Sequence, residues 1–241
     1  MPGLTGAELL RVWEESLAQH PLDRALTLLH AAEPGSSRAE LARLDVAARD
    51  ARLYRLRAEL FGRTLSAFAV CPACGERLEF SIDTGELGVV PESPGEWSVE
   101  ADGVAVRFRL PDSRDLAAAA SAGNAAAARA ELAARCVVSA TAPDGRELDP
   151  RTLGEPVLAA LSARMAEVAP TADVRLDLTC PACGHAWEIL LDIGEFLWAE
   201  IANLARRLLR EVHALARAYG WSEAEILAMS PRRRQSYLEL I

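Results

Sequence analysis

The residues with the most specific chemistry are four cysteines in two copies of one short motif. Cys71-Pro-Ala-Cys74-Gly75 recurs as Cys180-Pro-Ala-Cys183-Gly184, more than a hundred positions later. The copies stay alike beyond the motif, through four identical pairs: Glu79 and Glu188, Asp83 and Asp192, Gly85 and Gly194, Glu86 and Glu195. An internal repeat of this kind indicates one structural unit that is used twice.

Each motif has the form of a metal-binding knuckle. Two thiolates on one tight turn reach the same ion only if the backbone between them curls, and glycine allows the left-handed turn that this needs. Backbone N–H groups then point at sulfur and spread the thiolate charge. Two knuckles supply four sulfurs at about 2.3 Å from a tetrahedral zinc ion, with no position left open. We therefore predict a structural zinc site on four ligands: Cys71, Cys74, Cys180 and Cys183.

Other uses of these thiols stay open at this point. A thioredoxin-like redox pair usually lies at a helix N-terminus, whereas strands are expected on both sides of each pair here. Structural disulfides belong to oxidising compartments, and residues 1–10 show no secretory signal, so we expect a cytoplasmic protein. His185 follows the second knuckle and is an alternative ligand. Cys136 is interpreted as a buried, inert thiol.

No other group of residues predicts catalysis, and we expect that the protein is not an enzyme. The sequence contains no G-x-x-x-x-G-K-[ST], H-E-x-x-H or G-x-S-x-G motif. The histidines show no ligand spacing, and His213 is expected at the surface. Asp112 and Asp115 suggest a carboxylate pair, but they are better explained as the start of a helix, whose dipole favours acids.

Composition and charge narrow the class of protein further. The chain has 241 residues, 51% of them hydrophobic, and no uninterrupted apolar stretch of the roughly 18 residues that cross a bilayer. All 26 basic residues are arginine, and the net charge of −9 argues against a protein that coats nucleic acid. Arginines gather after Leu204, and the run Arg232-Arg233-Arg234 favours a solvated helix face or an acidic protein partner over phosphate.

Helices are predicted at both ends of the chain. In the first third they cover residues 5–19, 21–33 and 37–60. Capping boxes at Thr5 and Ser37 open the first and third of these helices. In the last part, apolar residues recur every three or four positions over 196–219, Gly220 ends that helix, and short helices begin at Ser222 and Ser230.

The middle of the chain has the period of strands. Strands are predicted over residues 64–70, 78–82, 97–101, 104–110 and 174–178. Asp102-Gly103 is a strong signal for a two-residue hairpin turn. Val106 and Phe108 alternate with polar residues, so one face of their strand is expected to be buried. Helices are predicted over residues 113–139, with an interruption at Gly123, and over 155–168.

Three stretches resemble a known family. They are the segment from Val106 to Leu116 with the later Ala134–Val138, the second knuckle with Trp187 and Asp192–Phe196, and the tail from His213 to the arginine run. Together they resemble zinc-knuckle baseplate proteins encoded beside contractile tails. These are the T-even-phage-type baseplate hub assembly chaperone family and its relatives in phage-like contractile injection systems.

We thus predict an α+β fold with a zinc-ribbon-like β centre and with N-terminal, inserted and C-terminal helices. The expected regions are an N-terminal helical region (1–62), a ribbon-like core with insertions (63–195) and a C-terminal helical arm (196–241). The resemblance implies a structural or assembly component whose partners are baseplate, tube or spike proteins. A nucleic-acid-binding zinc ribbon is the second hypothesis, and a redox enzyme is the third.

The C-terminal arm is the predicted contact with partners. Trp221, Tyr237 and the arginine run lie near a chain end, and Trp, Tyr and Arg are the residues that most often anchor interfaces. The apolar stripe of the preceding helix is expected to face either the N-terminal helices or another protein.

Overall fold

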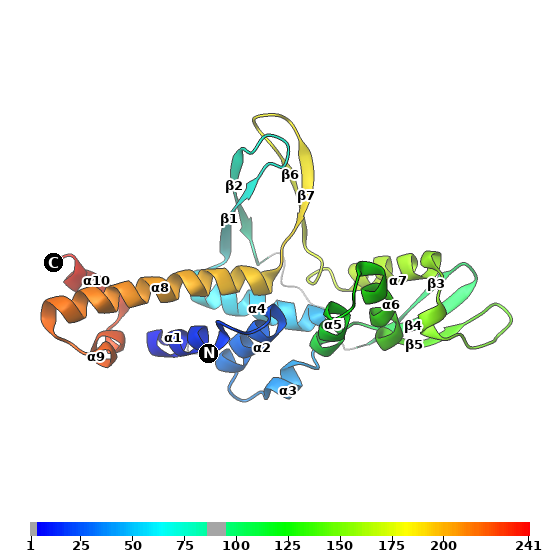
Figure 1. Ribbon diagram of the computed structural model, residues 1–241, viewed down its shortest axis with the longest axis horizontal. Coiled ribbons are helices and arrows are strands. Elements are labelled where there is room, and N and C mark those ends of the chain that lie inside the picture. Colours follow the sequence, from blue (N-terminus) through cyan, green and yellow to red (C-terminus); the bar gives the residue numbers. More distant parts are fainter. Residues whose placement is uncertain (1–3, 86–94) are drawn as a thin grey trace.

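The structure is a computed structural model that describes residues 4–85 and 95–241 (Figure 1). Its N- and C-terminal helices are α1 (Gly6–Ser16), α2 (Pro21–Ala32), α3 (Arg38–Leu41), α4 (Val46–Phe61), α8 (Ile193–Tyr219), α9 (Glu223–Ala228) and α10 (Pro231–Leu238). The middle contains β1 (Thr64–Val70), β2 (Arg77–Asp83), β3 (Glu96–Ala101), β4 (Val104–Arg109), α5 (Ser113–Ala120), α6 (Ala125–Cys136), β5 (Val137–Thr141), η1 (Pro150–Thr152), α7 (Glu155–Val168), β6 (Arg175–Thr179) and β7 (Ala186–Leu190). The predicted α+β class is confirmed.

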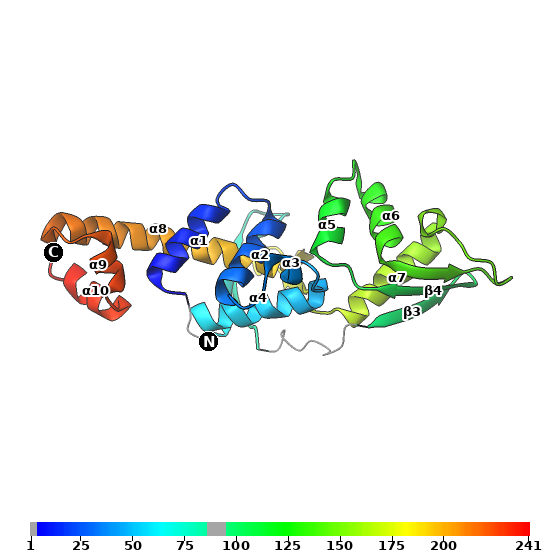
Figure 2. The same cartoon turned by 90° about the horizontal axis from the view of Figure 1, so that it is seen from below.

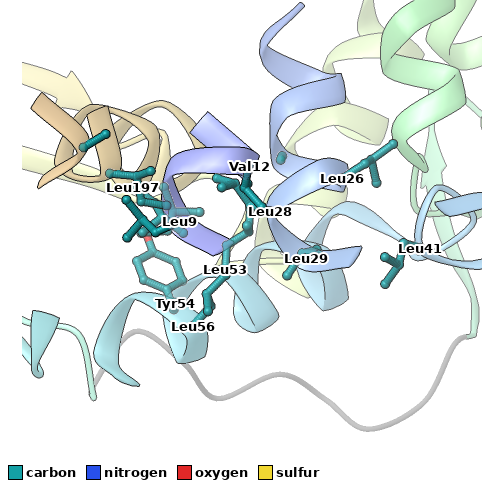
Figure 3. Close-up of a cluster of buried hydrophobic side chains, with 14 of the residues drawn as sticks. Leu9, Val12, Leu26, Leu28, Leu29, Leu41, Leu53, Tyr54, Leu56 and Leu197 are labelled. Carbon is teal, nitrogen blue, oxygen red and sulfur yellow. The ribbon is translucent and has the colours of Figure 1, made fainter. Parts of the chain in front are cut away.

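The main core lies among helices from the two ends of the chain. In Figure 3, leucines of α1, α2 and α4 meet Leu197 of α8. Leu28, Leu53 and Leu197 are completely buried. This burial explains why α8 is amphipathic, since one face of it closes the core and the other faces water. Below, we call this unit the helical body (α1–α4 and α8).

The third predicted helix is wrong in one respect, because it is broken in two. The capping box at Ser37 opens only the short α3, and α4 begins after Asp45. The Asp45 carboxylate accepts a hydrogen bond from the Ala48 N–H at 2.8 Å, and the Val46 N–H donates to the Pro111 carbonyl at 2.9 Å. The second N-cap at Asp45 and the hydrogen bond to Pro111 therefore start a new helix, although the apolar residues keep a helical spacing through this point.

The segment between the two knuckles folds around its own core, and we call it the inserted module (β3–α7). Strands β3, β4 and β5 form an antiparallel sheet in that order. Asp102 and Gly103 both have positive φ, as the predicted hairpin turn requires. Val106 and Phe108 are buried with residues of α6 and α7, which confirms the predicted alternation.

The predicted helix over 113–139 is wrong at its C-terminal end. Helix α6 stops at Cys136, and Val137–Thr141 form β5, which pairs with β4. Two β-branched residues, Val137 and Val138, begin the strand, and pairing with β4 buries Ala140 completely. Tertiary pairing thus overrides the helix propensity of the alanine-rich stretch.

The C-terminal helices fold back on the far end of α8 (Figure 2). Gly220 takes the left-handed conformation that ends α8, and the capping box at Ser222 opens α9, as predicted. Ile226 is completely buried, and the largely buried Arg234 pairs with Glu211 at 2.9 Å. The apolar stripe of α8 therefore packs within the chain, against α1, α2 and α4 along one part and against α9 and α10 at the end.

No helix in the described ranges is both long enough and apolar enough to span a membrane. The division into regions 1–62, 63–195 and 196–241 stays a prediction.

Asp115, at the start of α5, links β4 to α6 within the inserted module, and its replacement should destabilise the fold. Its carboxylate, 2% exposed, accepts hydrogen bonds from Arg109 at 2.6 Å and Arg135 at 2.9 Å. Asp115→Asn weakens both contacts, so we expect a loss of about 1–3 kcal/mol in unfolding free energy, measured in urea at pH 7. Asp144→Asn, at an exposed carboxylate 3.9 Å from Arg146, should cost almost nothing.

The loss of unfolding free energy in Asp115→Asn should depend on pH. Burial raises the pKa of Asp115, but hydrogen bonds from Arg109, the Asp112 N–H and Arg135 outweigh it, so the pKa is lowered overall. A lowered carboxyl pKa stabilises the fold above the unfolded value of about 4, and this stabilisation is lost as pH falls through the folded value. The difference between wild type and Asp115→Asn should therefore shrink below about pH 4; a constant difference would contradict this account.

Candidate metal centre

Two hairpins carry the knuckles and rise side by side from the helical body (Figure 1). Strands β1 and β2 form one hairpin and β6 and β7 the other, each as a separate antiparallel pair. Their registers correspond, because Val70 pairs with Arg77 and Thr179 with Ala186 at the two tips. The repeat seen in the sequence is therefore a repeat in structure. We call the two hairpins with their knuckles the two-hairpin arm (64–83 and 175–190).

Contacts at the base of each hairpin set where its tip lies. Arg57 on α4, almost fully buried, donates to the Gly62 carbonyl at 2.7 Å and pairs with Glu200 of α8 at 2.8 Å. At the second hairpin, the Leu191 N–H donates to the Val174 carbonyl at 2.9 Å. Neither contact could be predicted from the sequence. No motif indicates which distant residue a helical arginine will pair with, and a backbone hydrogen bond between Leu191 and Val174 does not depend on the type of side chain.

Strand alternation decides which faces of the hairpins oppose each other. Cys71 follows Ala67 and Ala69 on one face of β1, and Cys180 follows Leu176 and Leu178 on one face of β6. These faces are the half-buried ones, while the alternate residues are exposed. Since sulfurs of the two hairpins lie close together, the half-buried faces look toward each other.

The four sulfur atoms form a compact cluster between the tips. The Sγ atoms of Cys71, Cys74, Cys180 and Cys183 all lie within 4.8 Å of one another. Cys71 Sγ is 3.7 Å from Cys183 Sγ, and Cys74 Sγ is 3.6 Å from Cys180 Sγ. All four are free thiols, so neither knuckle holds a disulfide. A metal ion 2.3 Å from each sulfur would place neighbouring sulfurs about 3.8 Å apart, so the donor set fits a tetrahedral thiolate site.

Both knuckles make the same backbone bonds. The Cys71 N–H donates to the Glu76 carbonyl at 2.8 Å, and the Cys180 N–H to the His185 carbonyl at 2.9 Å. Gly75 and Gly184 have φ of +79° and +73°, the left-handed turn that was predicted. These turns also aim N–H groups at sulfur: those of Cys74 and Ala73 toward Cys71, and that of Glu76 toward Cys74.

The thiols influence one another's ionisation. Burial raises the pKa of Cys71, but hydrogen bonds from the backbone N–H groups of Cys74 and Ala73 outweigh it and lower that pKa to about 7. The Glu76 N–H lowers the pKa of Cys74, but the neighbouring Cys183 and Cys180 thiols raise it to about 12. One thiolate therefore forms easily, whereas full ionisation of the cluster requires a cation to offset the charges.

The side chains of the other residues singled out in the sequence are not part of the sulfur cluster. His185 is exposed and its ring stacks on Trp187, with centroids 6.0 Å apart. Cys136 is 1% exposed at the end of α6, and burial raises its pKa to about 12, in keeping with an inert thiol. Asp112 and Asp115 form the capping box of α5, and His213 is exposed on α8, both as predicted.

These features define a class: α+β proteins in which two cysteine-tipped hairpins bring four thiols close enough to share a metal ion. Within that class the family is shown by comparison. The chain belongs to the T4 bacteriophage base plate protein family, whose model matches residues 35–198. That span contains both knuckles and the whole inserted module. Comparison with curated proteins and with solved structures gave no match.

The family match bears on the predictions from sequence. The resemblance to baseplate proteins is confirmed, and it implies a structural role in the baseplate and contact with other baseplate components. Membership of a structural family also points to a non-enzymatic role. The hub assembly chaperone subtype and the link to contractile injection systems stay predictions.

The cluster should bind one metal ion per chain, and only its own cysteines should matter. Cys71→Ser and Cys180→Ser each leave three sulfurs, so we expect them to lose most of the metal measured by elemental analysis of protein purified without chelator. Cys136→Ala is the matched control, since it removes the cysteine outside the cluster. Equal metal content in all four proteins, or none in wild type, would contradict a metal site here.

Proposed function

We propose that the protein is a structural or assembly component of the baseplate of a contractile phage tail or a phage-like contractile injection system. In this proposal a structural zinc ion on Cys71, Cys74, Cys180 and Cys183 holds the two-hairpin arm in one conformation. The observation that carries the zinc proposal is the set of sulfur distances, 3.6 and 3.7 Å across the two knuckles. Family membership supports the setting, because the match covers both knuckles.

The arm needs such a tie because its own packing is thin. Along the four strands Leu65 is the one fully buried side chain, and the remaining inward residues are half-buried. Isolated two-stranded hairpins are marginally stable in water. A closed thiolate site joins two such hairpins and adds binding free energy to folding. The helical body and the inserted module have separate cores, so they do not depend on the metal in the same way.

Two alternative functions have less support. A nucleic-acid-binding ribbon would need an exposed basic surface, whereas the net charge is −9 and Arg234, the last of the three consecutive arginines, is buried against Glu211. A thioredoxin-like redox pair would need a helix N-terminus at its cysteines, and each pair here lies between two strands.

The C-terminal end offers a candidate surface for a partner. It is not the free arm that was predicted, because its short helices fold back on α8. Tyr219, Trp221 and Tyr237 form an aromatic cluster, with ring centroids of Tyr219 and Trp221 4.5 Å apart. Arg232 and Arg233 are exposed beside it, whereas Arg234 is part of the fold. Deletion of residues 222–241 would remove the completely buried Ile226 and break the pair of Arg234 with Glu211, so point variants are the cleaner test of this surface.

Removal of the metal should loosen the arm and leave the two cores intact. In hydrogen exchange of the chelated protein or of Cys180→Ser, backbone amides of β1–β2 and β6–β7 should lose at least tenfold protection. Amides of α4, α8 and β4 should keep theirs, because they belong to separate cores. Global loss of protection would mean that the metal holds the whole middle together; no change would mean that it is peripheral.

Charge reversal at the C-terminal end should break partner contacts without unfolding the protein. We expect Arg232→Glu with Arg233→Glu to keep wild-type zinc content and melting temperature but to lose co-purification with baseplate subunits. Arg206→Glu with Arg207→Glu, two exposed arginines on α8, is the matched control and should co-purify normally. Co-purification of the double variant at wild-type yield would contradict this interface.

A further inference from the structure

A cleft of about 660 Å³ lies where the helical body meets the inserted module. Residues of α3, α4 and the turn between them form one wall, and residues of β3, of the end of β4 and of the segment directly after β4 form the other. Its lining has a recognisable chemistry, with a mostly apolar floor and an arginine rim. The floor includes Leu44, Ala48, Ala51, Trp97 and Leu110. The volume lies in the range of pockets that bind ligands or peptide side chains.

The acids that line this cleft are already engaged in capping helices. The Glu40 carboxylate accepts from the Ser37 N–H at 2.8 Å, and Asp45 accepts from the Ala48 N–H at 2.8 Å. Asp112 accepts from two N–H groups at the start of α5, at 2.8 and 3.0 Å. These carboxylates stabilise helix ends, and each has at least one oxygen committed to that role.

The arginines of the cleft divide into two kinds. Arg52 pairs with Glu33 at 2.7 Å and Arg109 with Asp115 at 2.6 Å, so both are held by the fold. Arg43 and Arg55 are exposed, and within the described part of the chain they make no ion pair and no side-chain hydrogen bond. Two guanidinium groups thus stand over an apolar floor with their donors unused by the fold.

We propose that this cleft binds a segment of a partner protein in which carboxylates alternate with apolar side chains. Arg43 and Arg55 would pair with the carboxylates, and the floor around Ala48 and Trp97 would take the apolar side chains. The choice of a protein over a nucleic acid follows from the same lining. The apolar floor can take the apolar side chains of a peptide, whereas a phosphate backbone has no group that uses such contacts.

This binding site is independent of the zinc proposal. None of its lining residues is a cysteine or belongs to the two-hairpin arm. The metal content of each variant below therefore separates failure of the cleft from failure of the metal centre.

The test is direct binding of a short, capped, fluorescently labelled peptide of alternating glutamate and leucine, followed by anisotropy with the full chain. Its partner probe has glutamine in place of every glutamate. We expect saturable binding of the glutamate peptide and at least tenfold weaker binding of the glutamine peptide. Arg43→Glu with Arg55→Glu should weaken binding of the glutamate peptide at least tenfold at unchanged zinc content and melting temperature.

One further variant blocks the cleft directly, and another controls for the change in charge. Ala48→Glu places a carboxylate in the cleft at a helix position where glutamate is well tolerated, so it should block binding while the protein stays folded. Arg210→Glu with Arg217→Glu makes the same charge change on exposed α8 positions and should bind like wild type.

The opposite results are equally definite. Equal affinity of wild type and the Arg43, Arg55 and Ala48 variants would overturn the proposal, as would equal binding of the glutamine peptide. A single-stranded oligonucleotide that binds more tightly than the peptide at physiological salt, and is lost in the same variants, would overturn the choice of a protein partner.

Discussion

Four thiols must meet at one point although two of them lie more than a hundred residues from the other two in the chain, and the arrangement of the middle follows from this constraint. Sulfurs 3.6 and 3.7 Å apart require hairpins of matching register, whose tips reach the same height. They also require that each hairpin turn its cysteine-bearing face inward, which fixes the inward residues of all four strands. The duplicated sequence is the simplest way for one chain to meet both requirements.

The bases of the hairpins are as constrained as the tips. Arg57 joins the end of α4 to α8, and its partner Glu200 lies on the helix that begins directly after the second hairpin. One buried guanidinium thus couples the chain entering the first hairpin to the chain leaving the second. Hydrogen bonds from a buried charged group contribute more than neutral ones, and a lost partner leaves that charge unsatisfied. The arm is accordingly held at its base by the body and at its tip by the sulfur cluster.

Much of this could be predicted from sequence, wherever the signal was local. Capping boxes at Thr5 and Ser222, the Asp102-Gly103 turn and the stop at Gly220 all have the predicted conformation, because each needs only neighbouring residues. The four cysteines were found for the same reason, since spacing within a knuckle is local. The predicted helix boundaries were wrong where contacts with distant segments of the chain determine the local structure. Val46 bonds to Pro111 and splits a predicted helix, and pairing with β4 turns the end of another helix into β5.

The distribution of arginine connects the folding and the proposed binding. Arg57, Arg109 and Arg234 are tied to carboxylates within the chain, and they mark the arm's base, the inserted module and the C-terminal end respectively. At the cleft and on α10, exposed arginines form no ion pair within the described part of the chain: Arg43 and Arg55 at the cleft, and Arg232 and Arg233 on α10. In a chain of net charge −9, these exposed arginines are the positions where an acidic partner would bind most favourably.

The cleft and the C-terminal helices are lined by different residues, so the effects of substitutions in them on partner binding should add. The proposed metal-tied arm and the two proposed surfaces would let one subunit contact different neighbours at once, which is the geometric requirement for a part of a larger assembly.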